Sequence, residues 1–229
     1  MLDHVTAIAR PETKPATKPR FNVLIADDHA IVRAGYRQFL QEHPQVADIG
    51  EASSGSDTLA KLRVGTWHIL LLDISMPDRG GLDILQRIRT THPSLRILVV
   101  SGLPEQQYAS GVLKMGAVGY LSKDMAGPDL LRALTTVMQG NRFVSEALAE
   151  MLAQELVGER QTAAHEQLST RELQIFLKLA EGKTIGEIAS ELSLSVKTVS
   201  TYRSRILNAL EATTNAQLTG YAIRRGLIQ

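Results

Sequence analysis

The chain has 229 residues, enough for about two domains, and its 44% of apolar residues would fill two modest cores. It contains no cysteine, which excludes disulfide bonds, thiolate catalysis and cysteine-bound zinc. The formal net charge is +1, and the basic excess of residues 166–229, eight Lys and Arg against six Asp and Glu, is too small alone to indicate binding to nucleic acid.

Residues 1–20 place Pro11, Pro15 and Pro19 among Lys, Thr and Ala, which cannot form a core, so we predict a disordered basic tail. The same residues lack the apolar centre of a signal peptide. No run in the chain approaches the roughly 18 apolar residues of a membrane-spanning helix. We therefore expect a cytoplasmic protein that does not contact a membrane.

From residue 21, short apolar runs alternate with amphipathic segments. The run Ile69 to Leu72 is apolar without alternation, which is typical of a strand buried on both faces of a parallel sheet. Five strands alternating with five helices predict an α/β fold with a doubly wound, five-stranded parallel sheet over residues 21–141. The expected strands cover residues 21–26, 46–51, 69–72, 96–100 and 118–121, and the expected helices cover 30–41, 56–64, 82–90, 105–115 and 128–138.

The remainder of the chain is expected to be helical. Residues 142–167 should form a helix over 143–156 and a polar linker over 157–167. A small all-α domain of four helices should follow over residues 168–229, with Ser169 and Ser195 as N-caps and Gly182 as a left-handed C-cap. Its predicted helices are 170–181, 184–192, 196–210 and 215–225.

Polar side chains follow several of the predicted strands. Asp27 and Asp28 come after the first, Asp73 after the third, Ser101 after the fourth and Lys123 after the fifth, and the carboxyl ends of parallel strands meet at one edge. A lone Asp after a strand more often caps a turn, but three carboxylates in one place repel unless a cation lies among them. Oxygen ligands favour Mg²⁺. Asp73 would then attack phosphorus as a nucleophile, while Lys123 and Ser101 would stabilise the transferring phosphoryl group.

This part of the chain resembles the receiver domain of two-component response regulators, whose fold is flavodoxin-like. The resemblance implies that a histidine kinase phosphorylates Asp73. It also implies that Asp28, Asp73 and the backbone carbonyl of Ser75 bind Mg²⁺ with help from Asp27, and that Ser101 and Tyr120 form a switch. The residues that carry it are Asp27, Asp28, Asp73, Met76, Pro77, Gly81, Ser101, Tyr120, Leu121, Ser122 and Lys123.

Residues 184–205 are typical of a helix, a tight turn and a second helix. We expect Ile185, Ile188, Ala189 and Leu192 to pack against Leu194, Val196, Val199 and Ile206 across the turn. The outer face of the second helix is polar and basic and suits the major groove, with Lys and Arg on phosphates and small residues near the bases. An interaction module with a solvated face is the alternative. The predicted DNA-binding residues are Lys197, Thr198, Ser200, Thr201, Arg203, Ser204 and Arg205.

Five short runs are similar to the LuxR-type helix-turn-helix domain: LSTRE at 168–172, LAEGK at 179–183, IA at 188–189, KTV at 197–199 and RRGLI at 224–228. With a receiver in front, the chain resembles a NarL/FixJ-type response regulator. Ser193 departs from the pattern, since many relatives have glycine in this turn.

The resemblance implies a DNA-binding transcriptional regulator of a two-component system. Its implied partners are a sensor histidine kinase, double-stranded promoter DNA and a second copy of the phosphorylated chain, joined through the helix over residues 215–225; RNA polymerase is a further candidate. The receiver would promote only its own phosphotransfer and dephosphorylation, so the protein would not be an enzyme.

Two rival functions remain open from the residues. A phosphatase or phosphotransferase of the haloacid dehalogenase type also combines Asp, Mg²⁺ and Lys, but it requires a second acid two residues after the nucleophile, where this chain has Ser75. A DNA-binding protein that no longer uses phosphate is the second rival, but such a protein would not need the complete set of Asp28, Asp73, Ser101 and Lys123.

We also predict how the two domains communicate. The unphosphorylated receiver should mask residues 197–205 or 215–225 of the helical domain, and phosphorylation should turn Tyr120 inward and release that face.

Overall fold

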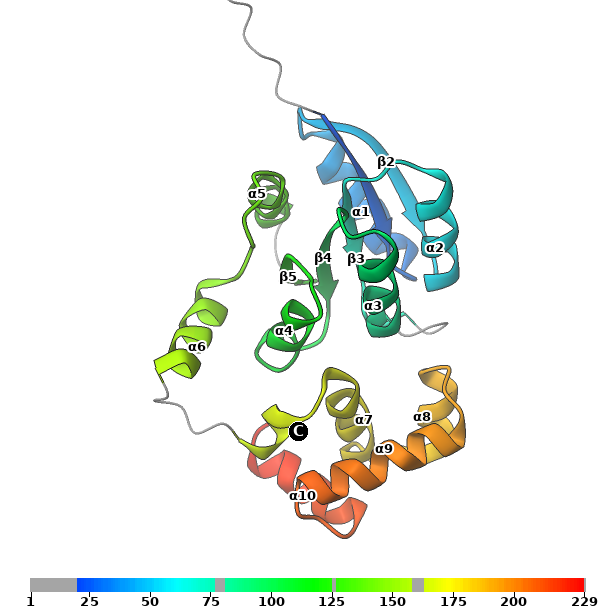
Figure 1. The fold of residues 1–229 in the computed structure, drawn as a ribbon, viewed down its shortest axis with the longest axis vertical. Helices are drawn as coiled ribbons and strands as arrows, with labels where there is room; N and C mark the ends of the chain where they lie inside the picture. Colours follow the sequence, from blue (N-terminus) through cyan, green and yellow to red (C-terminus); the bar gives the residue numbers. More distant parts are fainter. Residues whose placement is uncertain (1–19, 77–80, 125–126, 158–162, 229) are drawn as a thin grey trace, which may run out of the picture.

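A computed structural model describes residues 20–76, 81–124, 127–157 and 163–228 of the chain. An α/β part lies at the top of Figure 1 and a group of helices lies below it. The predicted tail falls outside the described residues, apart from Arg20.

A single parallel sheet organises the first part, in the strand order β2-β1-β3-β4-β5. The predicted fold class and all five strands are confirmed, with ends that move by at most one residue. Pairing of Ala26 with Leu72 aligns the carboxyl ends of β1 and β3, which precede Asp27 and Asp73. The strands are β1 (Phe21–Ala26), β2 (Val46–Ala52), β3 (Ile69–Leu72), β4 (Arg96–Ser101) and β5 (Gly119–Ser122).

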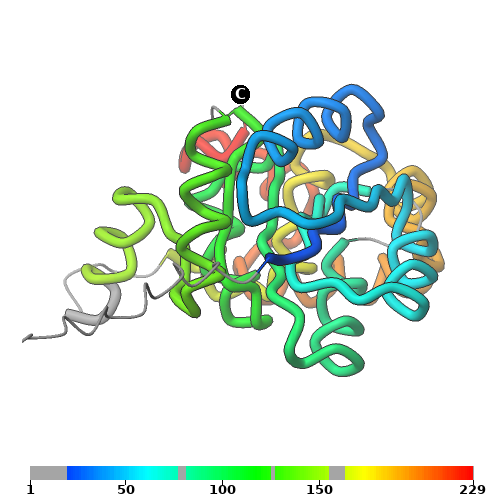
Figure 2. Tube along the Cα trace, turned by 90° about the horizontal axis from the view of Figure 1, so that it is seen from above, coloured from blue at the N-terminus to red at the C-terminus, as the bar shows by residue number. Residues whose placement is uncertain are grey.

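Helices cover both faces of the sheet. Leu70 and Leu72 point into the core beneath α2, α3 and α4, whereas Ile69 and Leu71 point into the core beneath α1 and α5. This double burial is why β3 is apolar at every position. Figure 2 shows α1 in blue and α3 in green on opposite sides of the strands. The helices are α1 (Ala30–Gln41), α2 (Gly55–Val64), α3 (Gly81–Thr91), α4 (Glu105–Lys114) and α5 (Gly127–Met138).

The helix expected over residues 143–156 begins later than predicted, as α6 (Glu146–Val157). Phe143 is instead buried and forms a bridge with Gly119 at the edge of β5. Ser145 then accepts a hydrogen bond from the Leu148 N–H, as an N-cap does, and so fixes the start of α6. The predicted linker is not entirely irregular, since a short 3₁₀ helix, η1 (Ala164–Gln167), lies within it.

The four predicted helices of the second part are confirmed as α7 (Thr170–Ala180), α8 (Ile185–Glu191), α9 (Val196–Ala209) and α10 (Asn215–Arg224). Ser169 and Glu172 form a reciprocal capping box, Ser195 caps α9, and Gly182 has a φ of +89°. Phe176 of α7 is fully buried at the centre of this part. Among the described residues, no helix has the length and apolar character needed to cross a membrane.

The turn between α8 and α9 holds Ser193 in the left-handed region, with a φ of +52°. A residue with a Cβ atom is strained there by roughly 1–2 kcal/mol, whereas glycine is not. Ser193 therefore adopts a backbone conformation that favours glycine, at the cost of some backbone strain.

We expect Ser193→Gly to be about 0.5–1 kcal/mol more stable than Ser193→Ala, because both variants lose the hydroxyl and only alanine keeps the Cβ. Urea unfolding followed by far-UV circular dichroism measures the difference. The only tryptophan, Trp67, lies in the α/β part, so its fluorescence provides an internal control whose midpoint should not separate the two variants. Coincident dichroism midpoints would show that the turn is unstrained.

Candidate functional site

Three carboxylates meet at the carboxyl edge of the sheet. Asp27 and Asp73 are each 1% exposed, and Asp28 is half-buried. One ligand atom from each of these residues and one from His29 lie within 4.8 Å of one another. The structure therefore brings together the three predicted acids, together with a histidine that the sequence analysis did not select. His29 could have been predicted from its position directly after Asp28 in the sequence.

Lys123 neutralises part of this charge. Its Nζ lies 2.7 Å from Asp27 Oδ2 and 2.7 Å from Asp73 Oδ2. Burial raises the pKa of the Asp73 carboxyl above its ordinary value, although Lys123 and the Ser75 N–H act in the opposite direction. Burial lowers the pKa of Lys123, but the two carboxylates outweigh it and the pKa is raised. Lys123 is thus held as a cation between two buried acids.

One lysine cannot compensate three carboxylates. Asp28 Oδ1 is buried and accepts no hydrogen bond from the residues that the structure describes, although the Nδ1 atom of the His29 ring lies 3.0 Å away. A buried oxygen without a hydrogen-bond donor, next to two further carboxylates, is suited to a small divalent cation. The donor set fits Mg²⁺.

The two serines predicted at the site, Ser75 for its backbone carbonyl and Ser101 for its hydroxyl, lie next to one another. The Ser75 N–H donates to Asp73 Oδ1 over 2.8 Å, and Ser75 Oγ lies 3.5 Å from Ser101 Oγ. A Cβ at Gly81 would collide with the backbone of Ile74 and the carbonyl of Asp73, so only glycine lets α3 begin this close to the acid.

Tyr120 is already inside the receiver. It is fully buried, its hydroxyl donates to the Leu103 carbonyl over 2.6 Å, and the Leu103 N–H donates to Ser101 Oγ over 3.2 Å. Burial raises the pKa of Tyr120, so the phenol remains a donor. The ring thus already lies in the core beneath α4 in this structure, and the predicted movement of Tyr120 on phosphorylation stays a prediction.

Most of the predicted DNA-binding side chains on α9 face solvent. Lys197, Thr201, Ser204 and Arg205 are exposed, and Thr198 and Ser200 are half-buried. Arg203 is less free, because its Nε donates to Asn215 Oδ1 of α10 over 2.7 Å. The outer face of α9 is therefore polar, accessible and basic at both ends.

Val196 departs from the prediction. Its neighbours Leu194 and Val199 pack into the helical core, but Val196 is 57% exposed and contributes nothing to that core. It is the first residue of α9, directly after the N-cap Ser195.

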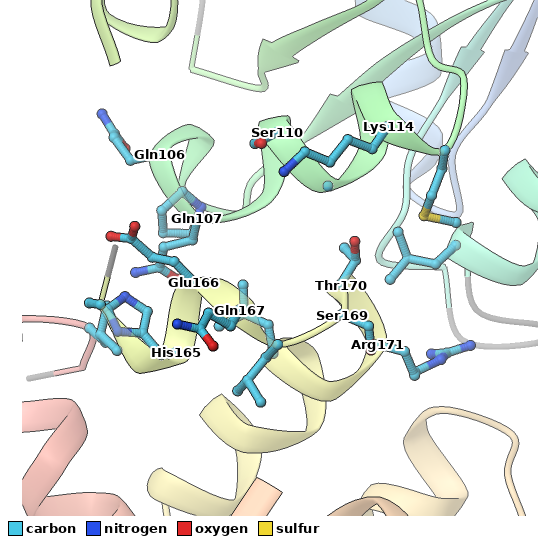
Figure 3. A pocket seen from close by; sticks show the side chains of 18 of the residues that line it. Gln106, Gln107, Ser110, Lys114, His165, Glu166, Gln167, Ser169, Thr170 and Arg171 are labelled. Carbon is cyan, nitrogen blue, oxygen red and sulfur yellow. The ribbon is translucent and has the colours of Figure 1, made fainter. Parts of the chain in front are cut away.

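The two parts touch through the start of α7. The Arg171 guanidinium, almost fully buried, forms an ion pair with Asp83 of α3 and donates to Gln174 Oε1 over 2.7 Å. On α4, a side chain at Gly111 would collide with the Thr170 hydroxyl, so glycine permits the close approach of α4 to α7. Figure 3 shows Thr170 pointing toward α4 and the Arg171 side chain extending sideways, away from α4.

A cavity of about 1560 Å³ lies beside this contact, lined by residues of α3, α4, α6, η1, α7 and α9 and by residues 225–228, which follow α10. It does not include the acid cluster. α7 lies between the α/β part and α9 in Figure 1, and Lys197 and Arg205 are exposed, whereas Arg225 at the end of α10 lines the cavity. The predicted masking of residues 197–205 or 215–225 by the unphosphorylated receiver stays a prediction.

Family models match both parts of the chain. Residues 23–135 match the response regulator receiver domain, and residues 166–222 match the bacterial regulatory proteins of the luxR family. The chain is 36% identical to response regulator UvrY of Escherichia coli, over 90% of this chain and 95% of that protein. It is 32% identical to response regulator GacA of Pseudomonas protegens, over 90% and 97%.

Solved structures of RcsB from Salmonella show the same architecture. One, bound to the promoter rprA with the phosphomimetic BeF₃⁻, has a TM-score of 0.67 at 29% identity and covers 88% of this chain and 98% of that chain. Another, from a study of its conformational dynamism for DNA interaction, has a TM-score of 0.70 at 30% identity and covers 89% and 96%.

We expect Asp83→Arg to separate the two parts, because it places a second cation against the buried Arg171. The exchange Asp83→Arg with Arg171→Asp should restore the contact. Since Asp83 is half exposed, Asp83→Arg should weaken the free energy of contact between the two parts by about 1 kcal/mol. Small-angle scattering measures the separation as an increase in the radius of gyration.

The control for this charge exchange is Asp57→Arg, which removes a similar ion pair with Lys61 on α2, far from α7. It should leave the radius of gyration unchanged. A double exchange that is as expanded as Asp83→Arg alone would show that this pair does not hold the domains together.

Proposed function

This chain belongs to the NarL/FixJ-type response regulators and serves transcriptional regulation within a two-component system, and on this premise we propose that a sensor histidine kinase switches it by phosphorylating Asp73. The observation that carries the proposal is the buried Asp73 carboxylate, held against Lys123 at a distance of 2.7 Å. We assign residues 21–141 to the receiver, 142–167 to a helix and linker, and 168–229 to the DNA-binding domain.

The proposed transfer begins with attack of an Asp73 carboxylate oxygen on the phosphorus of a phosphorylated kinase histidine. The oxygen–phosphorus bond forms, and the phosphorus–nitrogen bond breaks with its electrons leaving on the imidazole. Lys123 holds its proton throughout and pairs with the charge of the phosphoryl oxygens. The Ser101 hydroxyl binds another of these oxygens, which draws Ser101 and the Leu103 N–H toward the site.

The proposed Mg²⁺ ligands are Asp28, Asp73 and the backbone carbonyl of Ser75, with Asp27 in support. Bound there, Mg²⁺ supplies positive charge that lets a phosphoryl group approach three carboxylates. His29 lies next to Asp27 and Asp28 and accompanies this set, with its Nδ1 3.2 Å from Asp27 Oδ1.

The output we propose is binding of double-stranded promoter DNA by α9. Lys197, Arg203 and Arg205 contact the DNA backbone and Ser200, Thr201 and Ser204 lie near the bases, with Thr198 as a further contact. RcsB has been solved in complex with promoter DNA, and as two dimers bound to two parallel DNAs. We propose that the phosphorylated chain likewise forms a homodimer, through α10. RNA polymerase is a further candidate partner.

We propose that the receiver promotes only the transfer of a phosphoryl group to its own Asp73 and the later loss of that group, so the protein is not an enzyme. We also propose that it acts in the cytoplasm. A haloacid dehalogenase type of enzyme requires a second acid two residues after the nucleophile, but Ser75 stands there and its hydroxyl lies near Ser101. This favours retention of the phosphoryl group on Asp73 over rapid release to water.

Incubation with acetyl phosphate and Mg²⁺ should add the mass of one phosphoryl group, and Asp73→Asn should abolish this gain because the nucleophile is lost. Intact-mass spectrometry measures it. Asp124→Asn, which removes an exposed carboxylate just beyond β5, is the matched control and should still be labelled. An excess of chelator should stop labelling of the wild type without unfolding it. Equal labelling of Asp73→Asn would refute the assignment.

Lys197→Ala should weaken binding to all DNA duplexes by a similar factor and should lower the slope of log K against log salt by about 1 per DNA-binding domain, since one phosphate contact is lost. Fluorescence anisotropy over a range of salt concentrations measures both. Lys61→Ala removes the same charge from α2 and should change neither quantity. A changed preference for sequence would mean that Lys197 contacts bases.

A further inference from the structure

We propose that Val196 is a specificity-determining residue that reads the 5-methyl group of thymine in the major groove. The inference rests on the proposed function of α9 as the DNA-binding helix. It concerns a side chain that the sequence pattern placed in the core and that the structure places outside it.

The exposure of Val196 has no structural explanation within the described part of the chain. Its side chain is 57% exposed and does not join the helical core, whereas Leu194 and Val199 on either side do. The other large apolar side chains with high exposure, Ile31, Phe39, Val64 and Ile223, lie outside α9. Val196 is thus an apolar group on an otherwise polar surface.

The position of Val196 points to DNA as its occupant. The first residues of a recognition helix contact base edges, and Val196 is the first residue of α9. Ser195 accepts a hydrogen bond from the Thr198 N–H, which fixes the direction of the first turn. Lys197, directly beside it, is exposed, and no salt bridge among the described residues involves it, so it is available to a phosphate.

The chemistry of valine narrows the choice of base. Valine has no hydrogen-bond donor or acceptor and cannot read the polar pattern of the groove. The thymine methyl is the apolar group that the major groove presents, and apolar side chains contact it. Valine is also stiff at χ1 in a helix, so little side-chain entropy is lost when it packs against a methyl group.

The size of the effect follows from the burial of one methyl group, which is worth about a fourfold change in affinity. A homodimer on a two-fold symmetric site makes the contact twice, so removing both methyl groups should weaken binding about 15-fold. Symmetric substitution of both half-sites therefore makes the effect easy to measure.

The experiment uses the full chain, phosphorylated with acetyl phosphate, on a two-fold symmetric duplex selected from a random pool. Uracil replaces thymine at one symmetric pair of positions at a time, which removes the methyl group and preserves base pairing. For the wild type, we expect one position at which the change weakens binding about 15-fold. For Val196→Ala, binding to the thymine duplex should be weaker by a similar factor, and uracil at that position should cost nothing more.

Val64→Ala provides the matched control, because Val64 is an 89% exposed valine on α2. It should retain the full sensitivity to uracil. Since Val196 is outside the core, Val196→Ala should unfold at the wild-type temperature, which separates a lost DNA contact from a lost fold.

Three outcomes would overturn the inference. If replacing thymine by uracil lowers the affinity of Val196→Ala as much as that of the wild type at every position, Val196 does not touch a thymine methyl. If Val196→Ala weakens thymine and uracil duplexes equally while no position is sensitive, Val196 packs against the sugar-phosphate backbone. If the pool yields no bound duplex, although intact mass shows phosphorylated Asp73, the proposed DNA-binding function fails and this inference fails with it.

Discussion

The ion pairs of Lys123 with Asp27 and Asp73 are the constraint on which the receiver depends. Two carboxylates that are each 1% exposed would repel one another strongly, and a single ammonium group 2.7 Å from both makes their burial tolerable. The order of the strands makes this geometry available, because β1 and β3 are neighbours and Lys123 follows β5, two strands away. The third acid, Asp28, remains uncompensated, so the site holds a surplus of negative charge that suits a divalent cation.

Much of this could be predicted from the sequence, because the signals are local. The apolar run of β3 and the polar residues at the strand ends are read directly from spacing, and they located the carboxylates and the lysine. The predictions that were wrong depend on long-range packing. Phe143 forms a bridge with Gly119 in place of starting the predicted helix. Val196 fits an apolar pattern but has no partner to bury it, and no periodicity distinguishes these cases.

The contact between the domains could also not be predicted from the sequence. Asp83 and Arg171 are 88 residues apart, and neither stands out as more than a surface charge. In the structure, they join α3 to α7. Tyr108 of α4 is buried, and burial raises its pKa, with smaller contributions from Tyr120 and Glu181. One layer of packing thus connects the switch residues with the DNA-binding domain, while the outer face of α9 stays accessible.

Gly111 has a consequence for the dynamics of this layer. Glycine within a helix costs about 0.5–1 kcal/mol relative to alanine, so α4 gives up some of its own stability to let α7 approach. While the domains are docked, α7 covers that face and compensates the loss. Once the domains separate, α4 is a short helix with glycine in its interior and one face in water. Such a helix unfolds locally more readily. Amide hydrogens of α4 should then exchange faster than those of α5, and the order of this helix becomes a measure of domain docking.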